Sequence, residues 1–145
     1  PCHYVVADRS GRSFVWEHSP RRNREIIVDA DPGDDGRLVC TNHLLHRWPD
    51  PAALPADDGP IGTAARTYGR WRSLNAGATD AGVLDHDDIA EQFAAVSFRA
   101  PIAEARTFWH AQYDVDDASV ELSFFLRDVD GVSRYTEPLR FTASR

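Results

Sequence analysis

The stretch HYVVADRSGRSFVWE, residues 3–17, sets the character of the first part of the chain. Residues 3–8 and 13–17 are rich in β-branched and aromatic side chains, which favour extended strands. Arg9-Ser10-Gly11-Arg12 separates the two runs, and a short link that contains glycine is typical of a tight reversal of the chain. The stretch therefore predicts an antiparallel β-hairpin.

The hairpin is expected to continue into a meander. Residues 24–29 form a third β-rich run that ends at the turn-forming cluster 31–36, and residues 37–41 are interpreted as a fourth strand. Residues 47–62 contain four prolines and two glycines, a composition that predicts a long loop.

Two helices are predicted in the middle of the chain. The first spans residues 63–74 and is expected to end at Asn75-Ala76-Gly77, because glycine commonly follows a helix C-terminus. The second begins at Asp85, a good N-cap, and a stripe of apolar residues carries it to about residue 98.

Strands are expected again after the helices. Residues 107–113 and 119–126 predict a second hairpin, and residues 139–142 a last short strand. Antiparallel strands, then two helices, then antiparallel strands is the order of an α+β layered domain rather than of a βαβ fold. A length of 145 residues suits one domain over 1–145.

Composition and charge narrow the classes of function. The chain has 16 basic and 23 acidic residues and a net charge of -7, which is the wrong sign for binding phosphates or anionic lipid. It also contains no apolar run long enough to span a bilayer. We therefore expect neither nucleic acid nor membrane partners. Two cysteines, Cys2 and Cys40, suit a reducing cytoplasm, although a single disulfide between them stays open.

Few residues suggest stand-alone catalysis, because the motifs of serine hydrolases, zinc proteases and nucleotide-binding enzymes are absent. His43 and His46 suggest a metal site, but no cysteine or carboxylate at ligand spacing completes it, so two polar loop histidines are expected. We expect neither a metal nor a cofactor. The acidic residues beside His86 are explained by helix capping and the helix dipole. These residues are Asp85, Asp87 and Asp88.

Asn42 and Arg70 hold the most chemical promise. Asn42 ends an apolar run beneath the proline-rich loop, where its amide can donate a hydrogen bond to a developing oxyanion. The alternative is an asparagine that only caps a turn. Arg70 lies among aromatic residues on the predicted first helix and can orient a carboxylate or thiolate. The alternative is cation-π contact and ion pairing on a solvated face.

Four segments, taken in order, resemble a known family. HYVVADRSGRSFVWE (3–17) and VCTNH (39–43) look like the signature aDxxGxxxvxE followed by vxTNH. TYGRWRSL (67–74) resembles SxxRyxxL, and TFWHAQYD (107–114) with LSFFL (122–126) resembles a closing hairpin. The set is similar to that of the acyl-coenzyme A:6-aminopenicillanate acyltransferase-like N-terminal nucleophile (Ntn) hydrolases, relatives of choloylglycine hydrolase.

The resemblance implies the C-terminal half of an Ntn-type αββα sandwich, with antiparallel strands, two central helices and a closing hairpin. In that family a cysteine heading the mature chain attacks an acyl carbonyl, and it lies well upstream of the strand at 3–8. The resemblance makes Asn42 the oxyanion donor and Arg70 the site arginine, with Arg66 as the competing register. Cys2 is expected to be a packed side chain rather than the nucleophile, because no segment like that of the family nucleophile follows it.

The chain opens at Pro1 and contains no methionine, which predicts a processed product, a subunit or an excised piece. Two functions are then open. The first is the C-terminal portion of a cysteine-nucleophile linear-amide C-N hydrolase, or of an amide-forming acyltransferase, acting through an acyl-enzyme on a small acyl or amide substrate. The second is a non-catalytic relative that binds a small ligand or another chain. Half a sandwich leaves sheet edges uncovered, so association with the N-terminal segment or with a second copy is expected.

Overall fold

A computed structural model describes residues 2–19, 24–30, 38–57, 66–81, 84–97 and 106–143. They form two compact units, 1–85 and 86–145, each of which combines antiparallel strands with one α-helix. The predicted α+β class is confirmed, whereas the αββα arrangement and the single domain stay predictions. No helix within the described ranges has both the length and the apolar character needed to cross a membrane.

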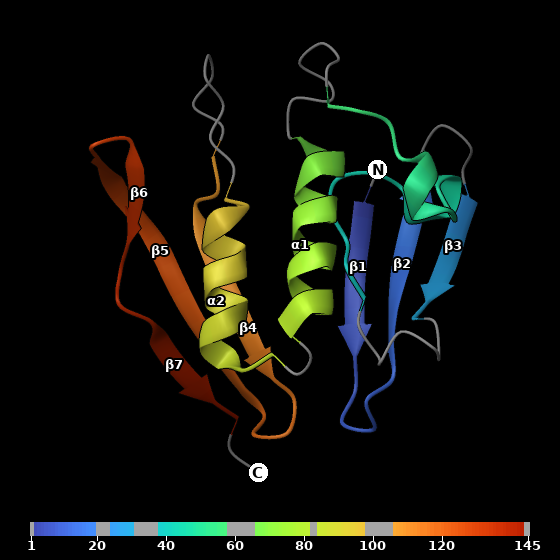
Figure 1. The fold of residues 1–145 in the computed structure, drawn as a ribbon. Helices are drawn as coiled ribbons and strands as arrows, with labels where there is room; N and C mark the ends of the chain where they lie inside the picture. Colours follow the sequence, from blue (N-terminus) through green and yellow to red (C-terminus); the bar gives the residue numbers. More distant parts are fainter. Residues whose placement is uncertain are drawn as a thin grey trace. The chain divides into compact units, whose positions relative to one another are not determined.

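A three-stranded antiparallel sheet opens the first unit (Figure 1). β1 (Cys2–Ala7) pairs with β2 (Ser13–Ser19), and β2 pairs with β3 (Arg24–Asp29). The predicted hairpin and the predicted third strand are therefore confirmed. Alternate side chains of β2 point inward, and Val15 and Glu17 are both 0% exposed, so this central strand carries the core of the sheet.

The turn between β1 and β2 follows from local chemistry. Asp8 Oδ1 accepts a hydrogen bond from the backbone N of Ser10 at 2.7 Å, and the backbone N of Asp8 donates to the carbonyl of Arg12 at 3.0 Å. Gly11 has a φ of +80°, a conformation that costs glycine little because it lacks a Cβ. The polar link between the two β-rich runs therefore reverses the chain as expected.

The predicted fourth strand is wrong. Residues 38–41 have no strand structure, and residue 37 lies outside the described residues. The carbonyl of Val39 accepts a hydrogen bond from Trp71 Nε1 at 3.1 Å, and the Thr41 side chain bonds to Thr67. The segment is thus tied to a helix through side chains, where a strand would have bonded a neighbouring strand through its backbone.

Two short 3-10 helices follow this segment, η1 (Leu45–Arg47) and η2 (Pro51–Ala53). The Asp50 side chain accepts a hydrogen bond from the backbone N of Ala52 at 2.9 Å and so caps η2. The predicted long loop is therefore broken by short helical turns up to residue 57, and its remaining residues, 58–62, lie outside the described part of the chain.

Helix α1 (Thr67–Ala81) is longer than predicted. It continues through residues 75–77, so glycine at the predicted stop is accommodated inside the helix. Residues 63–65, the predicted start, lie outside the described residues. The Asp57 carboxylate caps the first turn by accepting from the backbone N of Tyr68 (3.2 Å) and of Gly69 (2.5 Å). A Cβ on Gly69 would lie 2.7 Å from Asp57 Oδ2, so glycine permits this approach.

The second unit places one helix on a four-stranded sheet (Figure 1). Its elements are α2 (His86–Ala95), β4 (Trp109–Asp114), β5 (Ser119–Val129), β6 (Val132–Tyr135) and β7 (Leu139–Thr142). β5 is central and pairs with all three other strands. The predicted second hairpin and last strand are confirmed, whereas β6 was not predicted.

Helix α2 contacts β4 through a ring pair and a hydrogen bond. The rings of Phe93 and His110 are stacked with centroids 6.4 Å apart, and Gln112 Nε2 donates to the carbonyl of His86 at 3.0 Å. The helix ends at Ala95, earlier than predicted, and residue 98 lies outside the described part. Ser97 Oγ donates to the carbonyl of Phe93 at 3.0 Å, and this bond satisfies a carbonyl of the last turn.

Candidate functional site

The two residues that the resemblance places in a site are in direct contact. Arg70 lies near the start of α1, and Asn42 lies in the segment between β3 and η1. Arg70 Nη1 donates a hydrogen bond to Asn42 Oδ1 at 3.0 Å. The Asn42 side chain is exposed and Arg70 is half-buried, so the pair lies at the surface of the first unit.

The residues on either side of Asn42 are anchored to the first residue of α1. Thr41 Oγ1 donates to the carbonyl of Thr67 at 2.9 Å and lies 2.9 Å from Thr67 Oγ1. His43 Nδ1 lies 3.1 Å from both hydroxyl oxygens. Thr41, His43 and Thr67 are all buried. The TNH segment and the TxxR segment therefore meet twice, through this buried cluster and through the Asn42 to Arg70 bond.

Glu17 holds the chain that follows the TNH segment. Its Oε1 accepts from the backbone N of Leu45 at 2.5 Å, and its Oε2 accepts from His46 Nδ1 at 2.5 Å and from the backbone N of His46 at 3.3 Å. His3 Nδ1 lies 3.3 Å from Oε1. A carboxylate on the central strand of the sheet thus fixes η1 in place.

The charges in this region are set by burial and hydrogen bonding. Burial alone raises the pKa of Glu17, but the hydrogen bonds from His46 and Leu45 outweigh it, and the net pKa lies below its ordinary value. Burial lowers the pKa of Arg70, whose guanidinium nonetheless stays a cation at neutral pH. Burial also lowers the pKa of His43. The site thus combines a carboxylate, a guanidinium and a neutral imidazole.

His43 and His46 serve different partners. His43 contacts the two threonine hydroxyls, and His46 contacts the buried Glu17 carboxylate. Across the described residues, no three histidine, cysteine, aspartate or glutamate side chains are grouped so that they could hold a metal ion. Both histidines act as polar contacts within the first unit.

Three other residues singled out from the sequence lie apart from this contact. Arg66, the competing register for the arginine, is exposed and has a φ of +44°, and it is Arg70 that reaches Asn42. Cys2 lies in β1 and pairs with His18 across the sheet. Cys40 is a free thiol, and burial, to which the Glu17 charge adds, raises its pKa to about 11.

The acidic residues beside His86 occupy the start of α2, as capping requires. Asp87 and Asp88 lie in the first turn and Asp85 immediately precedes it. His86 Nε2 lies 3.4 Å from Glu121 Oε2, which links the helix to β5. These groups are on the surface of the second unit, where favourable interaction with the helix dipole accounts for them.

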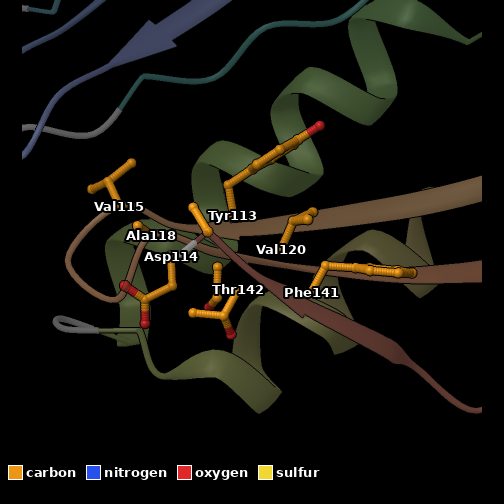
Figure 2. A pocket seen from close by; sticks show the side chains of 9 residues that line it. Tyr113, Asp114, Val115, Ala118, Val120, Phe141 and Thr142 are labelled. Atoms are coloured by element: carbon orange, nitrogen blue, oxygen red, sulfur yellow. The ribbon is translucent and has the colours of Figure 1, made fainter. Parts of the chain in front are cut away.

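The second unit also carries a pocket of about 400 Å³ at the turn between β4 and β5 (Figure 2). Tyr113, Val120 and Phe141 give it an apolar lining, and Asp114 is the one carboxylate among its lining residues. The Asp114 side chain accepts hydrogen bonds from the backbone N of Asp116 (2.9 Å) and of Asp117 (3.0 Å), which stabilise the turn and lower the pKa of Asp114. Asp114 is thus engaged in the turn, and the rest of the lining is apolar apart from the hydroxyls of Tyr113, Ser119 and Thr142.

Sequence reasoning singled out Asn42 and Arg70 as site candidates but missed the buried residues that anchor the chain on either side of Asn42. Glu17 appeared only as part of a resemblance, and Thr41 and Thr67 were not singled out. A signal for Glu17 was available in the sequence. Glu17 lies two residues after Val15, on the same face of the predicted strand, and a charged side chain on a buried face needs a partner. The identity of that partner, 28 residues away, was not readable from the sequence.

Comparison with known proteins adds no relative. No family model matches the chain, and neither the curated proteins nor the solved structures contain a match to it.

Proposed function

We propose that this chain supplies the oxyanion-binding part of a cysteine-nucleophile linear-amide C-N hydrolase or amide-forming acyltransferase. The observation that carries the proposal is the 3.0 Å hydrogen bond from Arg70 Nη1 to Asn42 Oδ1. It joins two residues that lie 28 positions apart and that were selected from the sequence as site residues.

The bond sets the direction in which Asn42 can donate. A guanidinium has only donors, so the atom that it contacts must be the amide oxygen, and the Nδ2 group turns away from Arg70. Among the described residues, none accepts a hydrogen bond from Asn42 Nδ2. A cation beside the amide oxygen also polarises the amide and strengthens its N-H donors. An exposed, oriented N-H donor suits a developing oxyanion.

The proposed reaction is acyl transfer through a thioester. A cysteine thiolate from a segment outside the printed residues adds to the carbonyl carbon of an amide, and the carbonyl oxygen becomes an oxyanion that accepts from Asn42 Nδ2. Collapse breaks the C-N bond, and the amine leaves with a proton. Water or a second amine then attacks the thioester, and the thiol is released with the acid or the new amide. Asn42 serves both tetrahedral intermediates.

The test is Asn42→Ala in the full-length protein that contains the nucleophile segment. We expect kcat to fall roughly 10²- to 10³-fold with little change in KM, because the bond strengthens only as charge develops on the oxygen. Asn42→Asp should be at least as harmful, since a carboxylate repels the oxyanion. If both variants lose about 1 kcal/mol of stability and their folded fractions retain kcat, Asn42 only caps a turn.

A second candidate is a non-catalytic module that binds a small ligand or another chain. Exposed apolar side chains on each unit favour it, such as Tyr4 and Val5 on β1 and Trp109 on β4. The same surfaces support association with the N-terminal segment, with another chain or with a second copy under either function. Absence of a cysteine-headed segment from the complete gene would favour the module. Sedimentation that gives a monomer at every concentration would argue against association.

A reducing compartment such as the cytoplasm belongs to the same proposal. Cys40 is a free thiol in the structure, and the proposed nucleophile must also stay reduced to attack a carbonyl. Expression of the full-length protein in reducing and oxidising compartments, followed by thiol counting and activity measurement, tests this: loss of activity on oxidation is expected.

A further inference from the structure

Glu17 is a fully buried carboxylate that accepts hydrogen bonds from the segment after Asn42 and also lies 3.3 Å from His3 Nδ1 on β1. The side chain is 0% exposed, and three N-H groups converge on its two oxygens. Two of these are backbone groups of Leu45 and His46 in η1, and the third is the His46 ring N-H. A buried carboxylate is costly unless it is fully bonded, so this arrangement strongly determines where η1 lies.

Asn42 needs such external anchors because its segment is not part of the sheet. Residues 38–44 have no strand or helix structure, so no ladder of backbone hydrogen bonds sets their position. On one side the buried Thr41 is bonded to Thr67 at the start of α1. On the other side η1 is bonded to Glu17 on β2. Asn42 therefore lies between two anchor points, one on α1 and one on the central strand β2.

We propose that Glu17 is a positioning residue for Asn42, holding η1 so that the Asn42 amide stays in contact with Arg70 and presents Nδ2 to the acyl oxygen. This inference rests on the proposed function. Glu17 does not touch the substrate; it acts through the backbone of Leu45 and His46. An error of about 1 Å in the placement of a reacting group can lower a rate about 10²-fold, so a distant anchor can control kcat.

The contact requires a carboxylate. A glutamine keeps one acceptor oxygen, but its amide nitrogen would face either the Leu45 N-H or the His46 N-H, and two donors repel each other. The variant Glu17→Gln therefore retains the size of the side chain and disrupts the hold on η1. It is the informative substitution, because it creates no cavity.

The experiment measures kcat, KM and melting temperature of Glu17→Gln in the full-length protein. We expect kcat to fall about 10- to 100-fold with KM changed less than about 2-fold. Val15→Ala is the matched control for stability: Val15 lies on the same strand, is also 0% exposed and has no polar side-chain atom that could bond η1. It should lower the melting temperature and leave kcat of the folded protein intact. Glu25→Gln, an exposed glutamate on β3, should change neither.

A double-mutant cycle shows whether Glu17 acts through Asn42. If it does, Glu17→Gln added to Asn42→Ala lowers kcat no further, because the positioned group is already gone. If the fold-losses in kcat of the two single variants multiply in the double variant, the positioning role is overturned. Full kcat in Glu17→Gln beside a large loss in Asn42→Ala overturns this inference alone. Full kcat in Asn42→Ala overturns the proposed function, and this inference with it.

A milder variant covers the case in which Glu17→Gln yields no folded protein. His46→Phe removes the ring N-H donor but leaves the Glu17 carboxylate and its two backbone donors. We expect kcat to fall about 3- to 10-fold, and we expect this loss to vanish in the Asn42→Ala background. An unchanged kcat in His46→Phe, or an equal loss in both backgrounds, contradicts the positioning role.

Discussion

The two units of the chain use polar side chains in opposite ways. In the first unit, four buried polar side chains join elements through hydrogen bonds: Glu17 joins β2 to η1, and the other three join the 38–44 segment to α1. The other three are Thr41, His43 and Thr67. In the second unit most polar contacts run along the sheet surface. Arg140 there bonds three partners on or beside β5. These partners are Asp117, Ser119 and Glu121.

The difference indicates where precise geometry is maintained. Buried polar groups are stabilising only when their partners are in place, so a cluster of them specifies one arrangement of the chain. Exposed ion pairs contribute little and tolerate rearrangement. We therefore expect substitutions in the first unit's cluster to change activity and stability together, and equivalent substitutions in the second unit to change neither strongly.

Among the substitutions that compare the two units, the largest loss of kcat is expected for Arg70. Arg70→Met removes the donor that orients the Asn42 amide, and we expect kcat to fall about 10- to 100-fold in the full-length protein. The matched substitution in the second unit is Arg106→Met, which removes a 2.9 Å contact with Asp128. Steady-state kinetics should show kcat unchanged for that variant. Equal losses in both variants would erase the distinction between the units.

A buried hydroxyl provides the next comparison. Thr67→Val leaves Thr41 Oγ1 and His43 Nδ1 without that hydroxyl, and we expect a loss of about 1–3 kcal/mol in the free energy of unfolding. Ser119 in the second unit is buried to the same extent, at 7% exposure for each residue. Ser119→Ala should cost less than about 1 kcal/mol, because Arg140 keeps its carboxylate partners. Urea unfolding of the two variants measures both losses. Equal losses would mean that burial sets the cost, and a larger loss in Thr67→Val would mean that the hydrogen bonds do.

Acid should act mainly through Glu17. Its pKa in the folded chain is below the ordinary 4.5, so the stabilising contribution of its ionised form is complete above about pH 4.5 and is lost as pH falls through the folded pKa. Thermal melts between pH 3 and 7 should show a melting temperature that falls as the pH is lowered, and Glu17→Gln should reduce this dependence on pH. Asp114 also has a lowered pKa but is exposed, so Asp114→Asn should reduce this dependence less. A larger reduction in Asp114→Asn than in Glu17→Gln would contradict the expected difference between the two units.

The last comparison concerns the reactivity of Cys40, which reports on the first unit alone because the second unit contains no cysteine. Its pKa of about 11, against an ordinary 9.0, keeps the thiol protonated at pH 8. In a Cys2→Ser background, alkylation of the native chain should be about 10²-fold slower than that of the unfolded chain. Stability should fall as pH rises from 9 towards 11, because the unfolded thiol loses its proton first. Equal alkylation rates would show that Cys40 is not buried.

Much of the fold was predictable because its signals are local. The turn at Asp8 and Gly11, the start of α2 directly after Asp85 and the strands of the second hairpin follow from neighbouring residues. β6 was predictable in the same way, since Asp130-Gly131 has positive φ at both positions, and Asp-Gly is a strong signal for a tight hairpin. Its omission was an error of interpretation rather than a limit of the sequence.

The sequence by itself determined which residue types were available at the site. It singled out Asn42 and Arg70, and it predicted that the first ends a strand beneath the proline-rich loop and that the second lies on a helix. Tertiary structure brought Arg70, and not Arg66, into contact with Asn42. It also tied residues 38–41 to α1, where a strand was expected, and gave the buried Glu17 its partners. The physical reason is range. Turns and caps depend on atoms within a few residues, whereas these contacts span 28 to 32 positions and form only when packing brings the elements together.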